Sequence, residues 1–306
     1  MTHTPVLYQE VLNLLRPQPD GRYLDGTLGA GGHTAGILAA SAPNGRVLGF
    51  DRDPEAIAFA RQRLAEYGSR VTFVNDSYAN MAQIAPTLGF APLDGILLDL
   101  GLSSRQLDDG ARGFAFRQEG PLDMRFDQTQ GETAADLLNN LTEVELTDIF
   151  WRYGEEKQSR AYARLIVANR PLTSTTQLAD LIAGRTGSQR RRIHPATQIF
   201  QALRIAVNQE LAAVETGVPA AISLLKPGGR LAVISFHSLE DRFVKRLFRQ
   251  QSQACTCPPE QPVCTCGGKA PLRLITRKAV QATAAEIENN PRSRSARLRV
   301  VEKNSV

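Results

Sequence analysis

The stretch from Tyr23 to Thr34, YLDGTLGAGGHT, constrains the fold more than any other part of the chain. A short apolar run ends at Leu24, four glycines then crowd a tight turn, and a helical pattern begins near Thr34. Glycine lets the backbone reach positive φ and approach a ligand without a Cβ in the way. A strand, a glycine turn and a helix N-terminus in this order predict a site for a nucleotide-like ligand.

Two common phosphate-binding loops do not fit this turn. Gly26 and Gly31 have the spacing of a P-loop, but Gly32-His33 stands where that loop requires Lys-Ser or Lys-Thr. The dinucleotide fingerprint GxGxxG fits Gly29 and Gly31 but fails at Thr34. What remains is D-x-T-x-G-x-G, which resembles the first motif of class I S-adenosylmethionine-dependent methyltransferases.

Polar residues follow the next predicted strands. Asp51 ends the strand 46–50 about 20 residues after the glycine turn, where a carboxylate can accept hydrogen bonds from ribose hydroxyls. Tyr78 follows the strand 70–75, and Asp99 ends the strand 93–98. Asp51 as a plain strand-end residue and Tyr78 as a core residue remain open alternatives. In a doubly wound sheet, all these strand ends face one crevice.

The βα alternation stops after the fourth strand. Residues 105–130 predict a long loop, and residues 132–202 read as helices only, including a capping box at Thr142-x-x-Glu145. The alternation then resumes with one long helix from Pro195 towards Leu225, a strand at 230–234 and a helix capped by Ser238. Segments 272–276 and 297–301 predict a closing antiparallel pair.

These elements predict an α/β fold: a doubly wound, seven-stranded, Rossmann-like sheet of the methyltransferase type with an inserted all-helical domain. We expect residues 1–105 plus 201–306 to form the first domain and residues 106–200 the insertion. The insertion carries Arg185 and Arg190-Arg191-Arg192, which form either a solvated face or a contact for RNA phosphates.

Composition and cysteine spacing bear on the partner, the cellular location and metal binding. The net charge of +5 favours an anionic partner, and 42% hydrophobic content is ordinary for a globular protein. The N-terminus does not read as a signal peptide, and no stretch is long and apolar enough to span a bilayer, so we expect a cytoplasmic protein. Whether the four cysteines bind zinc stays open, because C-x-C is not the usual C-x2-C spacing. They are Cys255, Cys257, Cys264 and Cys266.

Six sequence blocks together resemble the bacterial 16S ribosomal RNA (cytosine-N(4))-methyltransferase family over nearly the whole chain. They are HTPVLYQEVL at 3–12, DGTLGAGGHT at 25–34, DLGLSSRQLD at 99–108, RGFAF at 112–116, PLDMR at 121–125 and SFHSLEDR at 235–242. The resemblance implies methyl transfer from S-adenosylmethionine to the exocyclic amine of a cytosine in the decoding region of 16S rRNA. It favours rRNA within the small ribosomal subunit as the partner, and free RNA remains an open alternative. It also implies that the insertion takes part in RNA recognition. By matching motif positions, the residues that contact the methyl donor are Gly31, Gly32, His33, Asp51, Tyr78, Asp99 and Gln106.

The sulfonium of this donor is its own leaving group, so the reaction requires no metal ion and no covalent nucleophile. Asp99 is predicted as the catalytic residue, accepting an N–H of the amine, or alternatively as a ligand of the donor's amino group. The chain has Asp99-Leu-Gly-Leu where many amino-methyltransferases have [DNS]-P-P-[YF]. The aromatic that stacks on the base is therefore unassigned among Phe114, Phe116 and Phe236. His237 is either a proton acceptor or a capping or core residue.

Three rival functions remain at this point. A DNA amino-methyltransferase shares the chemistry, and a catalytically silent S-adenosylmethionine-binding assembly factor shares the donor loop. An NAD-dependent dehydrogenase shares only the glycine turn. The sequence leaves the oligomeric state open.

Overall fold

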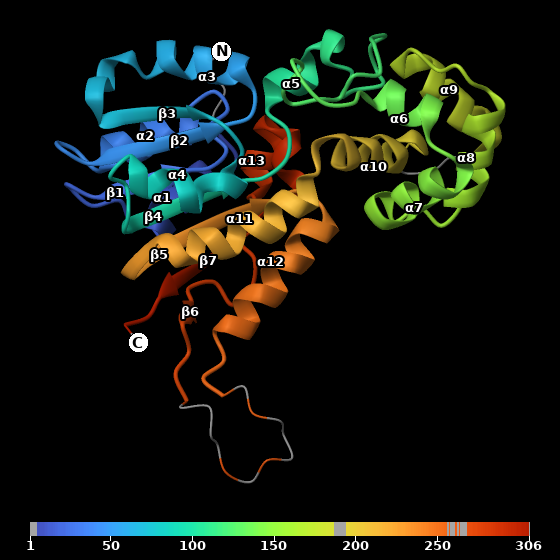
Figure 1. Ribbon diagram of the computed structural model, residues 1–306. Helices are drawn as coiled ribbons and strands as arrows, with labels where there is room; N and C mark the ends of the chain where they lie inside the picture. Colours follow the sequence, from blue (N-terminus) through green and yellow to red (C-terminus); the bar gives the residue numbers. More distant parts are fainter. Residues whose placement is uncertain are drawn as a thin grey trace. The chain divides into compact units, whose positions relative to one another are not determined.

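A computed structural model describes residues 5–186, 194–255, 257, 261, 263 and 268–305. The chain forms two compact units, one of residues 1–101 with 212–306 and one of residues 102–211 (Figure 1). No helix in the described part of the chain combines the length and the apolar character that a membrane span requires.

The first unit contains one seven-stranded sheet in the order β3-β2-β1-β4-β5-β7-β6. The first five strands in this order run parallel, and β7 is antiparallel to both of its neighbours. The predicted α/β class, the seven strands and the closing antiparallel pair are confirmed. The strands are β1 (Arg22–Asp25), β2 (Arg46–Asp51), β3 (Val71–Asn75), β4 (Leu93–Asp99), β5 (Leu225–Ser235), β6 (Leu272–Leu274) and β7 (Arg297–Lys303).

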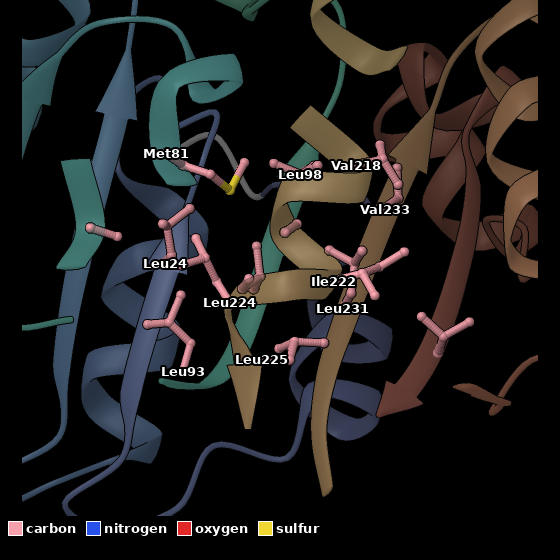
Figure 2. Close-up of a cluster of buried hydrophobic side chains, with 14 of the residues drawn as sticks. Leu24, Met81, Leu93, Leu98, Val218, Ile222, Leu224, Leu225, Leu231 and Val233 are labelled. Carbon is pink, nitrogen blue, oxygen red and sulfur yellow. The ribbon is translucent and has the colours of Figure 1, made fainter. Parts of the chain in front are cut away.

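Helices cover both faces of this sheet because neighbouring strand residues point to opposite sides. Leu24 and Leu98 belong to the cluster that includes side chains of α4, α11 and α12, whereas Tyr23 and Leu97 belong to the cluster with α1, α2 and α3. Figure 2 shows the first cluster, with Met81 of α4 and Val218 of α11 beside the strand leucines. The helices are α1 (Tyr8–Leu15), α2 (Gly32–Ala40), α3 (Pro54–Arg63), α4 (Met81–Thr87), α11 (Glu210–Leu224), α12 (Ser238–Gln251) and α13 (Ala284–Asn289), with short 3-10 turns η1 (Ala65–Arg70), η2 (Tyr78–Asn80) and η4 (Pro291–Ser295).

The second unit is helical around a core of its own, which contains Phe150, Tyr162 and Leu203. The capping box predicted at Thr142 is confirmed, since its hydroxyl accepts from the backbone N–H of Glu145 and its own N–H donates to that carboxylate. The helices are α5 (Ser104–Asp108), α6 (Ala134–Asn140), α7 (Glu143–Gly154), α8 (Ser159–Ala168), α9 (Thr175–Thr186) and α10 (Ala196–Asn208), with the 3-10 turn η3 (Gly110–Arg112).

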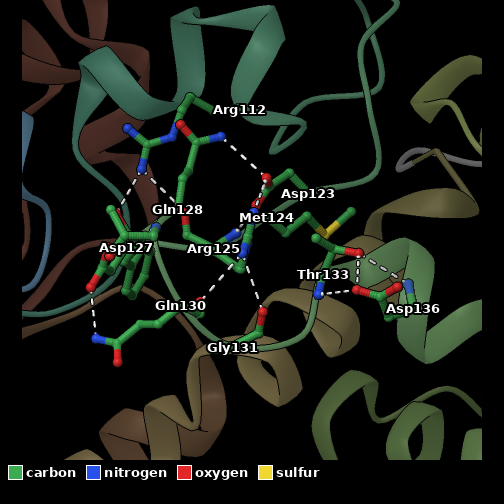
Figure 3. A network of polar contacts seen from close by, with 12 residues as sticks. Arg112, Asp123, Met124, Arg125, Asp127, Gln128, Gln130, Gly131, Thr133 and Asp136 are labelled. Carbon is green, nitrogen blue, oxygen red and sulfur yellow. Dashed lines mark hydrogen bonds and ion pairs between the residues drawn. The ribbon is translucent and has the colours of Figure 1, made fainter.

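Residues 105–130, predicted as a long loop, begin with α5 and η3 and are then held by side-chain hydrogen bonds. The guanidinium of Arg125 donates to both oxygens of Asp123, at 2.9 and 2.8 Å, and Arg112 donates to the carbonyls of Arg125 and Phe126 (Figure 3). Asn208 of α10 donates to the carbonyl of Met124 at 2.7 Å. The bonds from Arg112 and Asn208 satisfy backbone carbonyls that helices or strands would otherwise pair.

Two predicted helix boundaries, those of the helix from Pro195 and of the helix capped by Ser238, are wrong. The single helix expected from Pro195 towards Leu225 is two helices, because Gln209 adopts a left-handed conformation with φ 50° and ends α10. Asp53 caps α3, which ends at Arg63 because a 3-10 turn follows. Ser238 is the first residue of α12 rather than its cap.

His237 is the cap of α12. Its Nδ1 accepts from the backbone N–H of Glu240, and the Glu240 carboxylate accepts from the backbone N–H of His237, both at 3.4 Å. An imidazole nitrogen with a lone pair serves here as a serine hydroxyl serves in other helix caps. The interpretation of His237 as a capping residue is confirmed.

Candidate functional site

Three carboxylates lie at the carboxyl ends of three adjacent strands of the first unit. Asp25 ends β1, Asp51 ends β2 and Asp99 ends β4, and β1 pairs with both of the other strands. We call these three residues the acidic edge. In open α/β sheets, ligands bind outside the carboxyl ends of the strands.

The glycine turn joins this edge to helix α2. Gly29 and Gly31 have φ values of 49° and 74°, the left-handed region that favours glycine. The N–H of Gly29 donates to Asp51 Oδ2 at 2.7 Å, which ties the turn to the end of β2. Gly31 caps α2, and Gly32 is the first helical residue, where a Cβ would lie 2.5 Å from Cγ of Pro5. The turn therefore presents the N-terminal end of α2 to the acidic edge, as predicted.

Asp25 is the innermost carboxylate, 1% exposed. Its oxygens accept from the Thr34 hydroxyl at 2.7 Å and from the backbone N–H of Thr27 at 3.1 Å. Burial raises the pKa of Asp25 to about 6, although these hydrogen bonds act in the opposite direction. Asp25 thus connects β1 to the first turn of α2.

Asp51 accepts from two backbone N–H groups, those of Gly29 and Asp53. Burial raises its pKa to about 6, the two hydrogen bonds lower it, and the charges of Asp53 and Asp25 raise it further. A carboxylate that accepts from two backbone N–H groups of nearby residues at a strand end has a fixed orientation. A fixed orientation suits recognition of a pair of ribose hydroxyls.

Asp99 lies beside His33 of α2. Asp99 Oδ2 is 3.7 Å from Nε2 of His33, beyond hydrogen-bond distance, and the Asp99 side chain is 25% exposed. Burial and the charges of Asp25 and Glu240 raise the pKa of Asp99 to about 8. Burial lowers the pKa of His33 to about 4, so the imidazole is neutral, and its ring stacks on Tyr8 at a centroid distance of 6.0 Å.

The acidic edge has a negative charge that the described residues do not balance. Within the described part of the chain, no lysine or arginine forms an ion pair with Asp25, Asp51 or Asp99. Oδ1 of Asp99 and Nε2 of His33 are buried without a hydrogen-bond partner there. Buried polar atoms are normally paired, so this edge fits a ligand that supplies positive charge and N–H donors. An S-adenosylmethionine molecule, with its ammonium and sulfonium, has both.

Tyr78 lies in η2 after β3, and its ring packs against α11. A Cβ placed on Gly217 would lie 2.4 Å from Cδ2 of Tyr78, and one on Gly26 would lie 2.9 Å from its Cβ. The residue is partly buried against the core cluster of that face. This packing supports the core interpretation of Tyr78, while a second contact with an adenine ring stays a prediction.

The other predicted residues divide between the units. Gln106 belongs to the second unit, where its side chain accepts from the N–H of Ser103 in the capping box of α5, and its contact with a donor stays a prediction. Phe114 is buried in the core of that unit, and Phe116 stacks on His194 at 4.6 Å. Phe236 alone of the three aromatic candidates lies in the unit of Asp99, next to Gly101.

Sequence reasoning left two residues out of the predicted site, Asp25 and Tyr8. The signal for Asp25 was present, because it ends a strand as Asp51 and Asp99 do. Tyr8 carried no comparable signal, because its stacking on His33 depends on tertiary packing. Other expectations, on Arg190, Arg191, Arg192, Cys264 and Cys266, concern residues outside the described ones.

Comparisons with known proteins bear on the whole chain. The sequence profile described as "MraW methylase family" matches residues 1–304. A protein of Thermomicrobium roseum named "Ribosomal RNA small subunit methyltransferase H" is 55% identical over 99% of this chain and 94% of its own. One of the same name from Heliobacterium mobile is 51% identical over 98% of both chains. A solved structure titled as an rRNA methylase of Streptococcus thermophilus covers 100% of this chain and 99% of its own, at 11% identity and a TM-score of 0.44.

The family match covers both units, and both relatives are more than half identical to this chain along nearly their full lengths. The chain belongs to the MraW methylase family.

Proposed function

We propose that this chain transfers a methyl group from S-adenosylmethionine to the exocyclic N4 amine of a cytosine in 16S rRNA. The full-length relatives named as small-subunit rRNA methyltransferases support the reaction and the class of substrate. The observation that carries the proposal is the acidic edge beside the glycine turn, with the unpartnered Oδ1 of Asp99 at its centre. S-adenosylmethionine, when bound, supplies a methyl group on a positively charged sulfur.

The residues of the edge have separate roles in this proposal. Asp51, fixed by the N–H groups of Gly29 and Asp53, accepts from the ribose hydroxyls of the donor. The turn at Gly31 brings backbone close to the donor without a side chain between them. Asp25 holds the first turn of α2 through Thr34 and so keeps His33 and the turn in place.

Asp99 acts on the amine. The lone pair of a cytosine amine is delocalised into the ring, and a carboxylate that accepts one N–H localises it on nitrogen. As the N–C bond forms and the methyl–sulfur bond breaks, the amine proton passes to Asp99 and then to solvent. The positive charge of the bound donor favours the ionised form of Asp99, and the ionised carboxylate can accept this proton. Phe236, beside Gly101, is our candidate for stacking on the base.

The assembled small subunit is our proposed substrate, and the cytoplasm, where subunits assemble, our proposed location. We assign RNA recognition to the helical unit, 102–211, and donor binding to the other unit. A dinucleotide is disfavoured as ligand because the pyrophosphate would meet three carboxylates and no lysine or arginine paired with them among the described residues.

Mass spectrometry of nucleosides tests the proposal. Purified protein and labelled donor are incubated separately with small subunits, naked 16S rRNA and duplex DNA, and N4-methylcytidine is expected from the subunits. Asp99→Asn should reduce the rate by at least about 100-fold, the usual range for a general base. Asp94→Asn, at the other end of the same strand and paired with Lys226, is the matched control and should retain activity. Product from DNA alone, or full activity of Asp99→Asn, contradicts the proposal.

A further inference from the structure

Helix α12 carries a row of cations along the side that faces solvent. The spacing i, i+3, i+4, i+7 puts four exposed basic residues on one side of the helix. The two acidic residues of the helix, Glu240 and Asp241, lie in its first turn and are buried. We call the four residues the α12 cationic face: Arg242, Lys245, Arg246 and Arg249.

The opposite side of α12 is fully used by the core. Val244 and Phe248 are buried in the cluster shown in part in Figure 2, and Phe243 and Leu247 pack against it. A helix that enters a membrane interface needs its apolar side for the lipid. In α12 only the cationic side remains available, which favours a polyanion in water over a bilayer.

Three of the four cations of this face have no acidic partner among the residues that the structure describes. Lys245, Arg246 and Arg249 form no ion pair with any residue that the structure describes. Asp241, the nearest acid in the sequence, gives both oxygens to Arg299 at 2.7 and 3.1 Å. A second cation, half-exposed Arg297, lies 3.5 Å from the same carboxylate, so this end of the face is positive as well.

The surface arginines of α7 and α8 differ in this respect. Arg152 pairs with Asp148, and both Arg160 and Arg164 lie within 4 Å of Glu143. Two acids offset the charge of these three arginines, whereas Lys245, Arg246 and Arg249 of α12 have no acidic partner among the described residues. Arginine content alone therefore does not single out α12, whereas the absence of acids on its exposed side does.

Helix α12 begins near Asp99, the proposed catalytic residue. The helix begins three residues after Ser235, the last residue of β5, and Ile234 of β5 lies opposite Asp99 in the sheet register. From that point, fourteen residues at about 1.5 Å each extend the helix on the order of 20 Å. Helix α12 thus begins beside the strand end that carries Asp99 and runs on within the same unit (Figure 1), and its cations lie along it from Arg242 onward.

We propose that the α12 cationic face binds the phosphate backbone of the substrate RNA on the side of the target base. The choice of RNA as the polyanion rests on the proposed function. Each cation that neutralises a phosphate releases a counterion, so binding through this face is steeply dependent on salt. The contacts carry no base specificity, and they fix the register of the RNA on the catalytic unit.

The test compares two triple variants that remove the same charge. Lys245→Gln/Arg246→Gln/Arg249→Gln removes three cations of the face. Arg22→Gln/Arg61→Gln/Lys226→Gln removes three from the same unit that already have partners, namely the Ala91 carbonyl, the Phe73 ring and Asp94. Affinity for naked 16S rRNA is measured by filter binding over a salt series. The first variant should lower the slope of log affinity against log salt by about 2 to 3, and the control by less than about 1.

Three further measurements make the result decisive. Calorimetry with S-adenosylmethionine should give wild-type affinity for the first variant, which shows an intact fold. The single variant Arg246→Gln should lower the slope by about 0.7 to 0.9, and Lys245→Arg should leave it unchanged. In methylation of small subunits, the first variant should raise KM at least tenfold with kcat within twofold of wild type.

An unchanged slope in the first variant overturns the inference, as does an equal loss in both triple variants. It is also overturned if the first variant loses binding to phosphatidylserine vesicles while its RNA slope is unchanged. If the first variant shows the predicted change in slope but the wild-type protein methylates no RNA, the proposed function is refuted and this inference stands.

Discussion

Asp99 has a charge that depends on what lies beside it. Without a cation nearby, burial and two neighbouring carboxylates hold its pKa at about 8, so it carries a proton over much of the neutral range. A bound ammonium or sulfonium favours the ionised form and lowers that pKa. Donor binding should therefore release a proton below about pH 8.

This linkage predicts that affinity for S-adenosylmethionine rises with pH between about 6 and 8, by at most tenfold per pH unit for one proton released. Calorimetry in two buffers of different ionisation enthalpy measures the proton directly. Asp99→Asn should abolish the release that belongs to this residue, whereas Asp94→Asn should not. A pH-independent affinity in the wild-type protein would contradict the assignment.

The same pKa shift has a consequence for stability without ligand. The folded pKa of Asp99 lies above its ordinary value of 3.8, so the folded state holds the proton more tightly than the unfolded state. The contribution is fully present below about pH 4 and is lost as pH rises through about 8. Asp99→Asn should flatten the decrease in melting temperature from pH 5 to pH 8, measured by thermal denaturation. A slope equal to that of the wild type would show that Asp99 titrates normally.

Replacing Gly31 by alanine tests the role of the glycine turn, and the same replacement at Gly89 is the matched control. Gly31 has φ +74° and a Cβ there would lie 2.9 Å from Cδ1 of Leu64, whereas Gly89 has φ +73° with no atom within 4 Å. Gly89→Ala should cost about 1 to 2 kcal/mol of unfolding free energy for the backbone alone. Gly31→Ala should cost more and should also weaken donor binding at least tenfold. Chemical denaturation and calorimetry measure the two effects.

The positions of single residues could be predicted best where a residue directly follows an apolar strand. Asp51 and Asp99 follow apolar runs that can only be buried strands, so their position at the sheet edge was predictable. The left-handed residue Gln209 was not, because a glutamine gives no signal of positive φ. The cap at His237 was only one of several possibilities, since histidine serves many structural roles.

At the scale of elements, α2 depends on β1 through one buried hydrogen bond. The Thr34 hydroxyl donates to Asp25 Oδ2 at 2.7 Å, and both residues are buried. Thr34→Val keeps the shape but leaves that oxygen without its partner, which should cost about 1 to 3 kcal/mol of unfolding free energy. Thr34→Ser retains the hydroxyl and serves as the control in the same denaturation experiment. Equal losses in both variants would assign the effect to packing instead.

Element order was predictable because the strands of the first unit are short apolar runs between turn signals. The pairing of β7 between β5 and β6 was predictable only as an antiparallel closure. Residues 105–130 could not be predicted in detail, since the pairing of Arg125 with Asp123 and the reach of Asn208 to Met124 depend on tertiary positions. Turn residues in that stretch look the same in an ordered and an open loop.

For the whole molecule, two units with separate cores predict two unfolding transitions. The acidic edge belongs entirely to the unit of residues 1–101 and 212–306. S-adenosylmethionine at 100 times its dissociation constant should therefore stabilise that unit by about 2.7 kcal/mol. Differential scanning calorimetry should show the transition of this unit rising. A single transition, or an equal rise of both, would show that the units unfold together.

The uncompensated charge of the acidic edge has an effect after the reaction as well as before it. Once the methyl group has left, sulfur is a neutral thioether, and the spent molecule brings one positive charge fewer to Asp25, Asp51 and Asp99. The electrostatic attraction that draws the reactant in is then weaker for what must depart. The cluster of aspartates therefore favours release of the spent molecule over release of the unreacted donor.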